Sequence, residues 1–145
     1  MRRRVCYASR AMNPLATWIA QILSSAFLAV LFLQSGLDKV FDWEGNKGYI
    51  GSVFAKTPLA RMSTAMLLQI TVLELAVGAT SAAGCAMVLV TKASFVAFVG
   101  SALAGLNILA LFFGQRIAKD YAGSAGLVPY MLFAIATMLL QAHTL

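Results

Sequence analysis

The chain has 145 residues, of which 61% are hydrophobic and 11% are charged, and its formal net charge is +6. Soluble domains carry roughly 25% charged residues, so this chain lacks the polar side chains needed to cover a water-exposed surface. Apolar runs recur that are long enough to cross a hydrocarbon layer about 30 Å thick, and they lack the alternation of barrel strands. The composition therefore predicts an all-α membrane protein, a single four-transmembrane-helix bundle.

The positive charge is better explained by the membrane than by nucleic acid. The 11 Lys and Arg residues lie mainly at the ends of apolar runs, where basic side chains meet lipid headgroups. Cys6 and Cys85 form no C-x-x-C motif, and His143 is the only histidine. We therefore expect no nucleic-acid partner, no metal site and no intrinsic cofactor.

Residues 1–14 are predicted to be a basic cytoplasmic arm, and residues 15–145 the transmembrane domain. The arm carries arginines and no acid, and the apolar run after it is too long for a cleaved signal peptide. Four spans place both termini on one side of the membrane, and the basic arm favours the cytoplasm. Transmembrane helices are predicted at about 15–37, 58–83, 93–113 and 127–141, the last with Pro129 in its first turn.

The connection 38–57 is too long for a simple turn and is predicted to contain a short helix. Asp42 is placed as its N-cap, and the residues after it could form one apolar face. Such a helix could lie in the membrane interface, and the segment could equally pack as a loop over the bundle. Both alternatives stay open. The next transmembrane helix is expected to start at Thr57-Pro58.

The second transmembrane helix carries a polar stripe formed by Thr71, Glu74, Gly78 and Ser81, which should face protein rather than lipid. Glu74 lies about 18–20 Å beyond Arg61, close to the bilayer midplane. A charged carboxylate is costly there, so Glu74 is expected to be protonated, paired or next to a water-filled pocket. An equally weighted alternative is that Glu74 has a structural role and hydrogen-bonds to polar residues on neighbouring helices.

Most of the other charged residues are expected at one end of the bundle. The candidate polar pocket or ion-pair network consists of Asp38, Lys39, Glu74, Arg116, Lys119 and Asp120, with Gln34 and Asn107 as supporting polar residues. One interpretation is a pocket that binds a small amphipathic molecule or relays a proton. The other is an ion-pair network that ties the connection 38–57 to the loop around Gln115–Tyr121.

Three segments carry a family resemblance: S-G-L-D-K-V-F-D after the first apolar run, E-L-A-V-G around Glu74, and F-G-Q-R-I-A-K-D-Y-A-G. The chain from the first to the fourth predicted helix resembles the DoxX family. This resemblance implies a four-helix protein of the bacterial inner membrane, related to subunits of thiosulfate:quinone oxidoreductases. It carries the family's polar set onto Asp38, Lys39, Glu74, Arg116 and Asp120.

The expected function is an accessory or anchoring subunit of a larger respiratory-type or redox membrane complex, not catalytic by itself. Its expected partners are the lipid bilayer and other membrane-protein subunits. The first alternative is a quinone-linked oxidoreductase or quinone-binding protein, in which a quinone or lipid would be bound. The second alternative is a small transporter.

Overall fold

The computed structural model describes residues 13–145, and all regular structure in them is helical. The elements are α1 (Pro14–Phe41), α2 (Trp43–Phe54), a 3-10 turn η1 (Ala60–Met62), α3 (Ser63–Thr91), α4 (Phe95–Ile117) and α5 (Tyr121–Ala142). Four helical segments, α1, η1 with α3, α4 and α5, are long and apolar enough to cross a membrane. The predicted fold class is thereby confirmed. All but the last two residues of the predicted basic arm lie outside the described residues.

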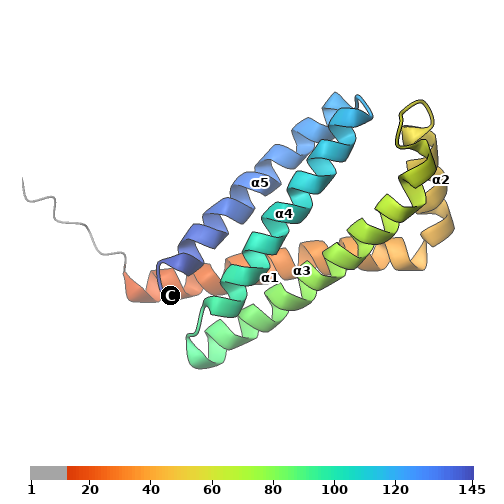
Figure 1. Ribbon diagram of the computed structural model, residues 1–145. Coiled ribbons are helices and arrows are strands. Elements are labelled where there is room, and N and C mark those ends of the chain that lie inside the picture. The colour runs from red at the N-terminus through yellow and green to blue at the C-terminus, as the bar shows by residue number, and fades with distance from the viewer. Residues whose placement is uncertain (1–12) are drawn as a thin grey trace, which may run out of the picture.

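The long helices pack in chain order, α1 on α3, α3 on α4 and α4 on α5 (Figure 1). The start of α1 and the end of α5 also lie together, where Gln21 Nε2 donates to the Leu140 carbonyl at 3.1 Å. The opposite end of the bundle contains the end of α1, all of α2, and the start of α3 (Figure 1). We call this second end the α2 end.

Small residues let the helices approach to main-chain contact. A Cβ on Gly78 of α3 would lie 2.8 Å from the Leu33 nitrogen of α1. A Cβ on Gly84 would lie 2.5 Å from the Ala97 nitrogen of α4. Thr71, Glu74, Gly78 and Ser81 are all buried, which confirms that the predicted stripe faces protein. Close approach of this kind replaces the hydrophobic driving force that helices lack in lipid.

The apolar core lies midway along the bundle, and the outer faces are apolar as well. The core cluster consists of Leu28, Phe32, Val77, Ala104, Ile108 and Ala134. Large apolar side chains on every long helix point outward, among them Leu23, Val72, Leu109 and Leu132. A water-soluble bundle would carry polar groups there, whereas lipid solvates these side chains.

The second long helix begins and ends later than predicted. Thr57 accepts from the Leu59 nitrogen at 3.2 Å, as a start signal should, but the 3-10 turn intervenes and α3 begins at Ser63. The helix then passes through Gly84, one residue beyond its predicted end, and this glycine gives Ala97 of α4 room to approach. It ends at Thr91, and Lys92 follows in the left-handed conformation with φ 59°.

The last helix begins six residues earlier than predicted, at Tyr121 instead of Leu127. Asp120 is its N-cap, and Oδ1 accepts from the Gly123 nitrogen at 2.9 Å. The connection that we expected between the predicted helices 93–113 and 127–141 is therefore a turn of three residues, 118–120. Pro129 consequently lies inside α5 and not in its first turn, which corrects the prediction.

The short helix in the connection exists as predicted, and it packs onto the bundle. α2 follows Asp42 directly, although the Asp42 carboxylate makes no capping hydrogen bond; its carbonyl accepts from Asn46 instead. Phe54 is 5% exposed, and its ring lies 3.6 Å from where a Cβ on Gly114 of α4 would be. The apolar face of α2 thus covers the gap between α3 and α4.

Candidate functional site

A buried ion pair joins α1 to α3. Lys39 Nζ lies 2.9 Å from Glu74 Oε2, and only 2% of the Glu74 side chain is exposed. Ser35 completes the group: its hydroxyl donates to Glu74 Oε1 at 3.1 Å and accepts from Lys39 Nζ at 2.9 Å. Lys39 also donates to the Ser35 carbonyl at 3.2 Å and to Glu74 Oε1 at 3.1 Å.

This arrangement explains how an acid is accommodated inside the membrane span. Glu74 lies 11 residues after Ser63, which is about 16 Å along α3 at 1.5 Å per residue. A lone carboxylate at that depth would lose its hydration without replacement. A lysine with three donors and a hydroxyl on the neighbouring helix replace part of that hydration. Of the three expectations for Glu74, pairing is the one found.

Asn107 of α4 lies at the same level as Glu74. Ser81 of α3 lies in tight contact with Gly100 of α4, which fixes the register of these two helices. Glu74 lies seven residues before Ser81 and Asn107 seven residues after Gly100, and each interval is about two helical turns. Asn107 is fully buried, and neither its amide nitrogen nor its amide oxygen has a hydrogen-bond partner in the protein. The centre of the bundle therefore contains an amide donor and an amide acceptor for which the described residues supply no hydrogen-bond partner.

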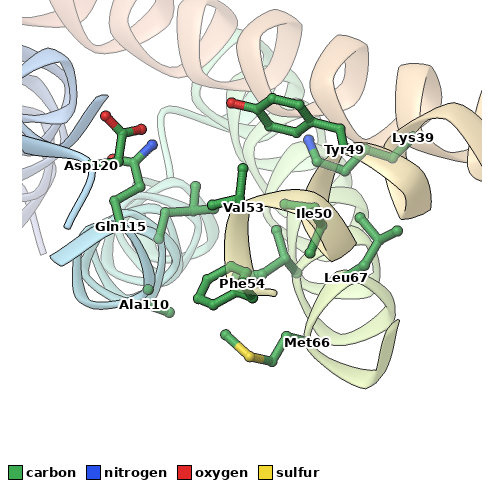
Figure 2. A pocket seen from close by; sticks show the side chains of 13 residues that line it. Lys39, Tyr49, Ile50, Val53, Phe54, Met66, Leu67, Ala110, Gln115 and Asp120 are labelled. Carbon is green, nitrogen blue, oxygen red and sulfur yellow. The ribbon is translucent and has the colours of Figure 1, made fainter. Parts of the chain in front are cut away.

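A pocket with a volume of about 120 Å³ lies at the α2 end, next to the ion pair. Its walls are apolar side chains of α2, α3 and α4, which are Ile50, Val53, Phe54, Met66, Leu67, Ile70, Ala110 and Leu111. Polar groups come from Lys39, Tyr49, Gln115 and Asp120. Figure 2 shows Gln115 and Asp120 together on one side of the pocket and Lys39 on the other. Pockets for small molecules commonly combine apolar walls with a few polar groups of this kind.

The polar side of the pocket is built by the turn between α4 and α5. Lys119 adopts the left-handed conformation (φ 61°), and the Asp120 nitrogen donates back to the Gln115 carbonyl at 2.9 Å. This is a Schellman ending, which reverses the chain within three residues. It brings Asp120, fixed as the α5 N-cap, beside Gln115, whose Oε1 is buried and has no hydrogen-bond partner.

The remaining predicted residues do not join this site. Asp38, Lys119 and Gln34 are exposed, and Gln34 lies on the outer face of α1. Arg116 is exposed too, and its guanidinium stacks on Tyr121 at 4.7 Å from the ring centroid. Within residues 13–145 the ion pairs are Lys39–Glu74 and an exposed Lys47–Glu44 pair. No ion-pair network among these residues therefore ties α1 to the α4–α5 turn.

A second polar cluster, which the sequence analysis did not single out, joins α1 to α3 and α5 at the end of the bundle opposite the α2 end. Gln141 is fully buried, and its Nε2 donates to the Gln21 carbonyl at 3.1 Å and to Ser25 Oγ at 3.0 Å. Trp18 Nε1 donates to the Val88 carbonyl at 2.9 Å. The sequence does contain a signal for this cluster, which is the presence of Gln21 and Gln141 inside apolar runs. An amide in a membrane helix usually faces another helix.

Searches against protein-family models, curated proteins and solved structures find no match to this chain. Its class consequently rests on the fold itself, an all-α membrane protein with four candidate spans. Within the described residues, no group of three or more His, Cys, Asp or Glu side chains could hold a metal ion. The chemistry that the arrangement supports is recognition of a small molecule with an apolar body and a polar head.

Proposed function

We propose that this protein binds the headgroup of a membrane-soluble, single-ring amphiphile of the quinone type in the pocket at the α2 end. The observation that carries this proposal is the composition of the pocket, in which apolar walls meet a polar side formed by Gln115 and Asp120. The wall residues Met66–Ile70 lie in the first turns of α3, and Ala110–Gln115 lie in the last turns of α4. A lipid-soluble molecule would reach such a place from the bilayer.

The size of the pocket supports one aromatic ring. Its volume is about 120 Å³, and a closed apolar cavity of about 150 Å³ in another protein holds benzene. Leu111, Phe54 and Ile70 offer contacts for the faces of a ring, and a ring substituent could extend from the pocket into lipid. The pocket is too small for a macrocyclic cofactor.

We further propose that the chain acts as a DoxX-like subunit of a redox membrane assembly in the bacterial inner membrane, with cytoplasmic termini. The resemblance in the three segments quoted above supports this part. In such an assembly this chain would hold the quinone-type molecule, and a partner would carry the redox centre. Extraction in mild detergent followed by native mass measurement tests this part, and a chain that always runs alone contradicts it.

The binding proposal is tested with the protein in lipid nanodiscs and a short-chain benzoquinone as the probe. Ala110 lines the pocket, so Ala110→Phe would place a ring where the ligand ring is expected. We expect the apparent affinity to fall by about tenfold or more, the equivalent of roughly 1.4 kcal/mol. Isothermal titration calorimetry, corrected with empty nanodiscs, measures this change.

Ala86→Phe is the matched control, because Ala86 is an exposed residue of α3 outside the pocket. This variant adds the same ring to an exposed face of α3 and should bind the probe as the unaltered protein does. Equal binding by both variants, or no saturable binding to the unaltered protein, contradicts the proposed site.

A further inference from the structure

A second pocket lies at the end of the bundle opposite the α2 end. Its volume is about 440 Å³, within the range of about 300–1,000 Å³ that is usual for small-molecule sites. The first turns of α1, the turn between α3 and α4 and the end of α5 surround it, and Figure 1 shows these three segments together. The ends of membrane-spanning helices lie near the lipid headgroups, so this pocket opens at their level. We call it the Lys92 pocket; its lining consists of Pro14, Leu15, Thr17, Trp18, Gln21, Lys92, His143 and Thr144.

Two polar side chains of the Lys92 pocket already use their donors within the protein. Gln21 Nε2 donates to the Leu140 carbonyl at 3.1 Å and to Thr144 Oγ1 at 2.6 Å. Trp18 Nε1 donates to the Val88 carbonyl at 2.9 Å. These bonds hold α1 to α3 and α5, and they form the wall of the pocket instead of contacting a ligand.

Lys92 and His143 carry donors that these bonds do not use. Both side chains are exposed, and neither belongs to the ion pairs found within residues 13–145. The lysine ammonium has three donors and a positive charge, and an imidazole has at least one N–H in either protonation state. A ligand in this pocket therefore meets a cation from the α3–α4 turn and a hydrogen-bond donor from the end of α5.

The side-chain charge at this end of the bundle is positive. All acidic side chains of the chain lie at the α2 end or at the centre of the bundle; they are Asp38, Asp42, Glu44, Glu74 and Asp120. The terminal carboxylate of Leu145 is not part of the lining. The sequence before α1 adds four further cations, which are Arg2, Arg3, Arg4 and Arg10. An anionic ligand is consequently attracted to this end and meets no carboxylate side chain in the pocket.

The backbone of Lys92 also draws attention to its side chain. Lys92 follows α3 in the left-handed conformation, with φ 59°. Glycine is the usual residue at such a helix end, because a Cβ disfavours this conformation. Backbone geometry therefore does not explain a lysine at this position, whereas a charge at the pocket does. Lys119 adopts the same conformation at the α2 end, with φ 61°, and offers a matched comparison.

From these observations we propose that the Lys92 pocket binds the phosphate group of an anionic lipid headgroup. Lys92 supplies the positive charge, and His143 donates a hydrogen bond from the α5 side. Basic pockets between membrane helices recognise anionic headgroups in this way. A lipid is favoured over a free phosphate because Leu15, which lines the pocket, is exposed and the outer faces of the bundle are apolar, so that acyl chains can lie against them. This proposal is independent of the ligand proposed for the α2 end.

The test counts lipids bound to the protein by native mass measurement. The full chain in zwitterionic detergent receives equal amounts of a phosphatidylglycerol and a phosphatidylcholine with the same acyl chains. Both lipids contain a phosphate, but the choline cation cancels the net charge of the second. One lysine near an anionic headgroup should make the phosphatidylglycerol bind roughly fivefold more tightly. Raising the salt concentration should reduce this preference.

Substitutions at Lys92 separate the charge from the fold. Lys92→Gly removes the cation and suits the left-handed backbone, so the protein should fold as stably as before while the preference falls to about one. Lys92→Asn is a second charge-free variant that this conformation tolerates, and Lys92→Arg should keep the preference. Lys119→Gly is the matched control, because it makes the same change in the same backbone conformation at the other end. Its preference should equal that of the unaltered protein.

Soluble competitors distinguish a lipid from a free phosphate compound. Inorganic phosphate and glycerol 3-phosphate, each at the concentration of the lipids, should leave the bound phosphatidylglycerol in place. Displacement by either one would assign the pocket to a soluble phosphate and overturn the lipid assignment. Equal binding of the two lipids to the unaltered protein would overturn the proposal, as would a preference that persists in both Lys92→Gly and Lys92→Asn or disappears in Lys119→Gly.

Discussion

Removing either partner of the Lys39–Glu74 pair should destabilise the bundle strongly, and removing both should not. Lys39→Met keeps the length of the apolar stem and deletes the charge, which leaves Glu74 with the Ser35 hydroxyl as its hydrogen-bond donor. Glu74→Leu leaves the lysine without its counter-ion at the same place. Each single variant therefore contains an uncompensated group in a poorly hydrated environment.

The expected magnitude follows from the burial of the pair. Removal of one partner of a buried ion pair typically costs about 3–5 kcal/mol, and we expect the upper part of this range for Lys39→Met because Glu74 is only 2% exposed. Glu74→Leu should cost less, since 19% of the Lys39 side chain is exposed and water can reach it. The double variant Lys39→Met with Glu74→Leu should lie within about 1 kcal/mol of the unaltered protein, because well-packed apolar replacements are often neutral.

Reversible unfolding in mixed detergent–SDS micelles, followed by circular dichroism, gives the free energies for this cycle. The matched control is the exposed Lys47–Glu44 pair, whose 3.7 Å contact should contribute no more than about 0.5 kcal/mol. A cost below about 1 kcal/mol for Lys39→Met would refute the reasoning. So would a double variant that loses as much stability as the two single variants together, because the charges would then not be coupled.

Two further predictions concern the way the helices meet. Gly84→Ala places a methyl group 2.5 Å from the Ala97 nitrogen and should destabilise the protein by about 1–3 kcal/mol in the same unfolding assay, whereas Gly105→Ala, which meets nothing within 4 Å, should be neutral or stabilising. Asp120→Ala removes the α5 N-cap and should cost about 0.5–2 kcal/mol, which Asp120→Asn should largely restore. Asp38→Ala, at an exposed residue four positions before the N-cap of α2, is the neutral comparison. Equal stabilities of the two glycine variants, or of Asp120→Ala and Asp120→Asn, would contradict these predictions.

Much of the fold could be predicted from the sequence, because the length and apolarity of a segment are enough to identify a membrane helix. Two of the errors in helix boundaries lie at glycines. The predicted helices 58–83 and 127–141 leave out Gly84 and Gly123, but Gly84 lies where two backbones meet, and Gly123 lies where the Asp120 cap needs space. A glycine that ends a helix and a glycine that lets another chain approach look identical in one sequence, since the difference depends on a residue far away.

The ion pair could have been assigned in part from the phase of α1. The buried residues Ser25, Ala29, Phe32 and Gly36 follow one another at three- or four-residue intervals, and the next position in this series is Lys39. Asp38 and Gln34 fall outside that phase, and both are exposed. Helix phase thus distinguishes the inward lysine from its outward neighbour, whereas charge alone had grouped them together. The partner on α3 could not be assigned in the same way, because the register of α1 against α3 depends on contacts such as Gly78 with Leu33.

The same turn of α1 connects the stability of the bundle to the chemistry of the pocket. Lys39 lines the pocket, yet its donors are directed to Ser35 and Glu74, so the positive charge that should attract a carbonyl or an anion is already neutralised. If Lys39 were free, the pocket would hold an uncompensated positive charge next to its apolar walls. Because Ser35 and Glu74 bind those donors, Gln115 and Asp120 on the opposite side are left to contact the polar head of a ligand. The buried carboxylate would thereby influence which ligand binds without touching it.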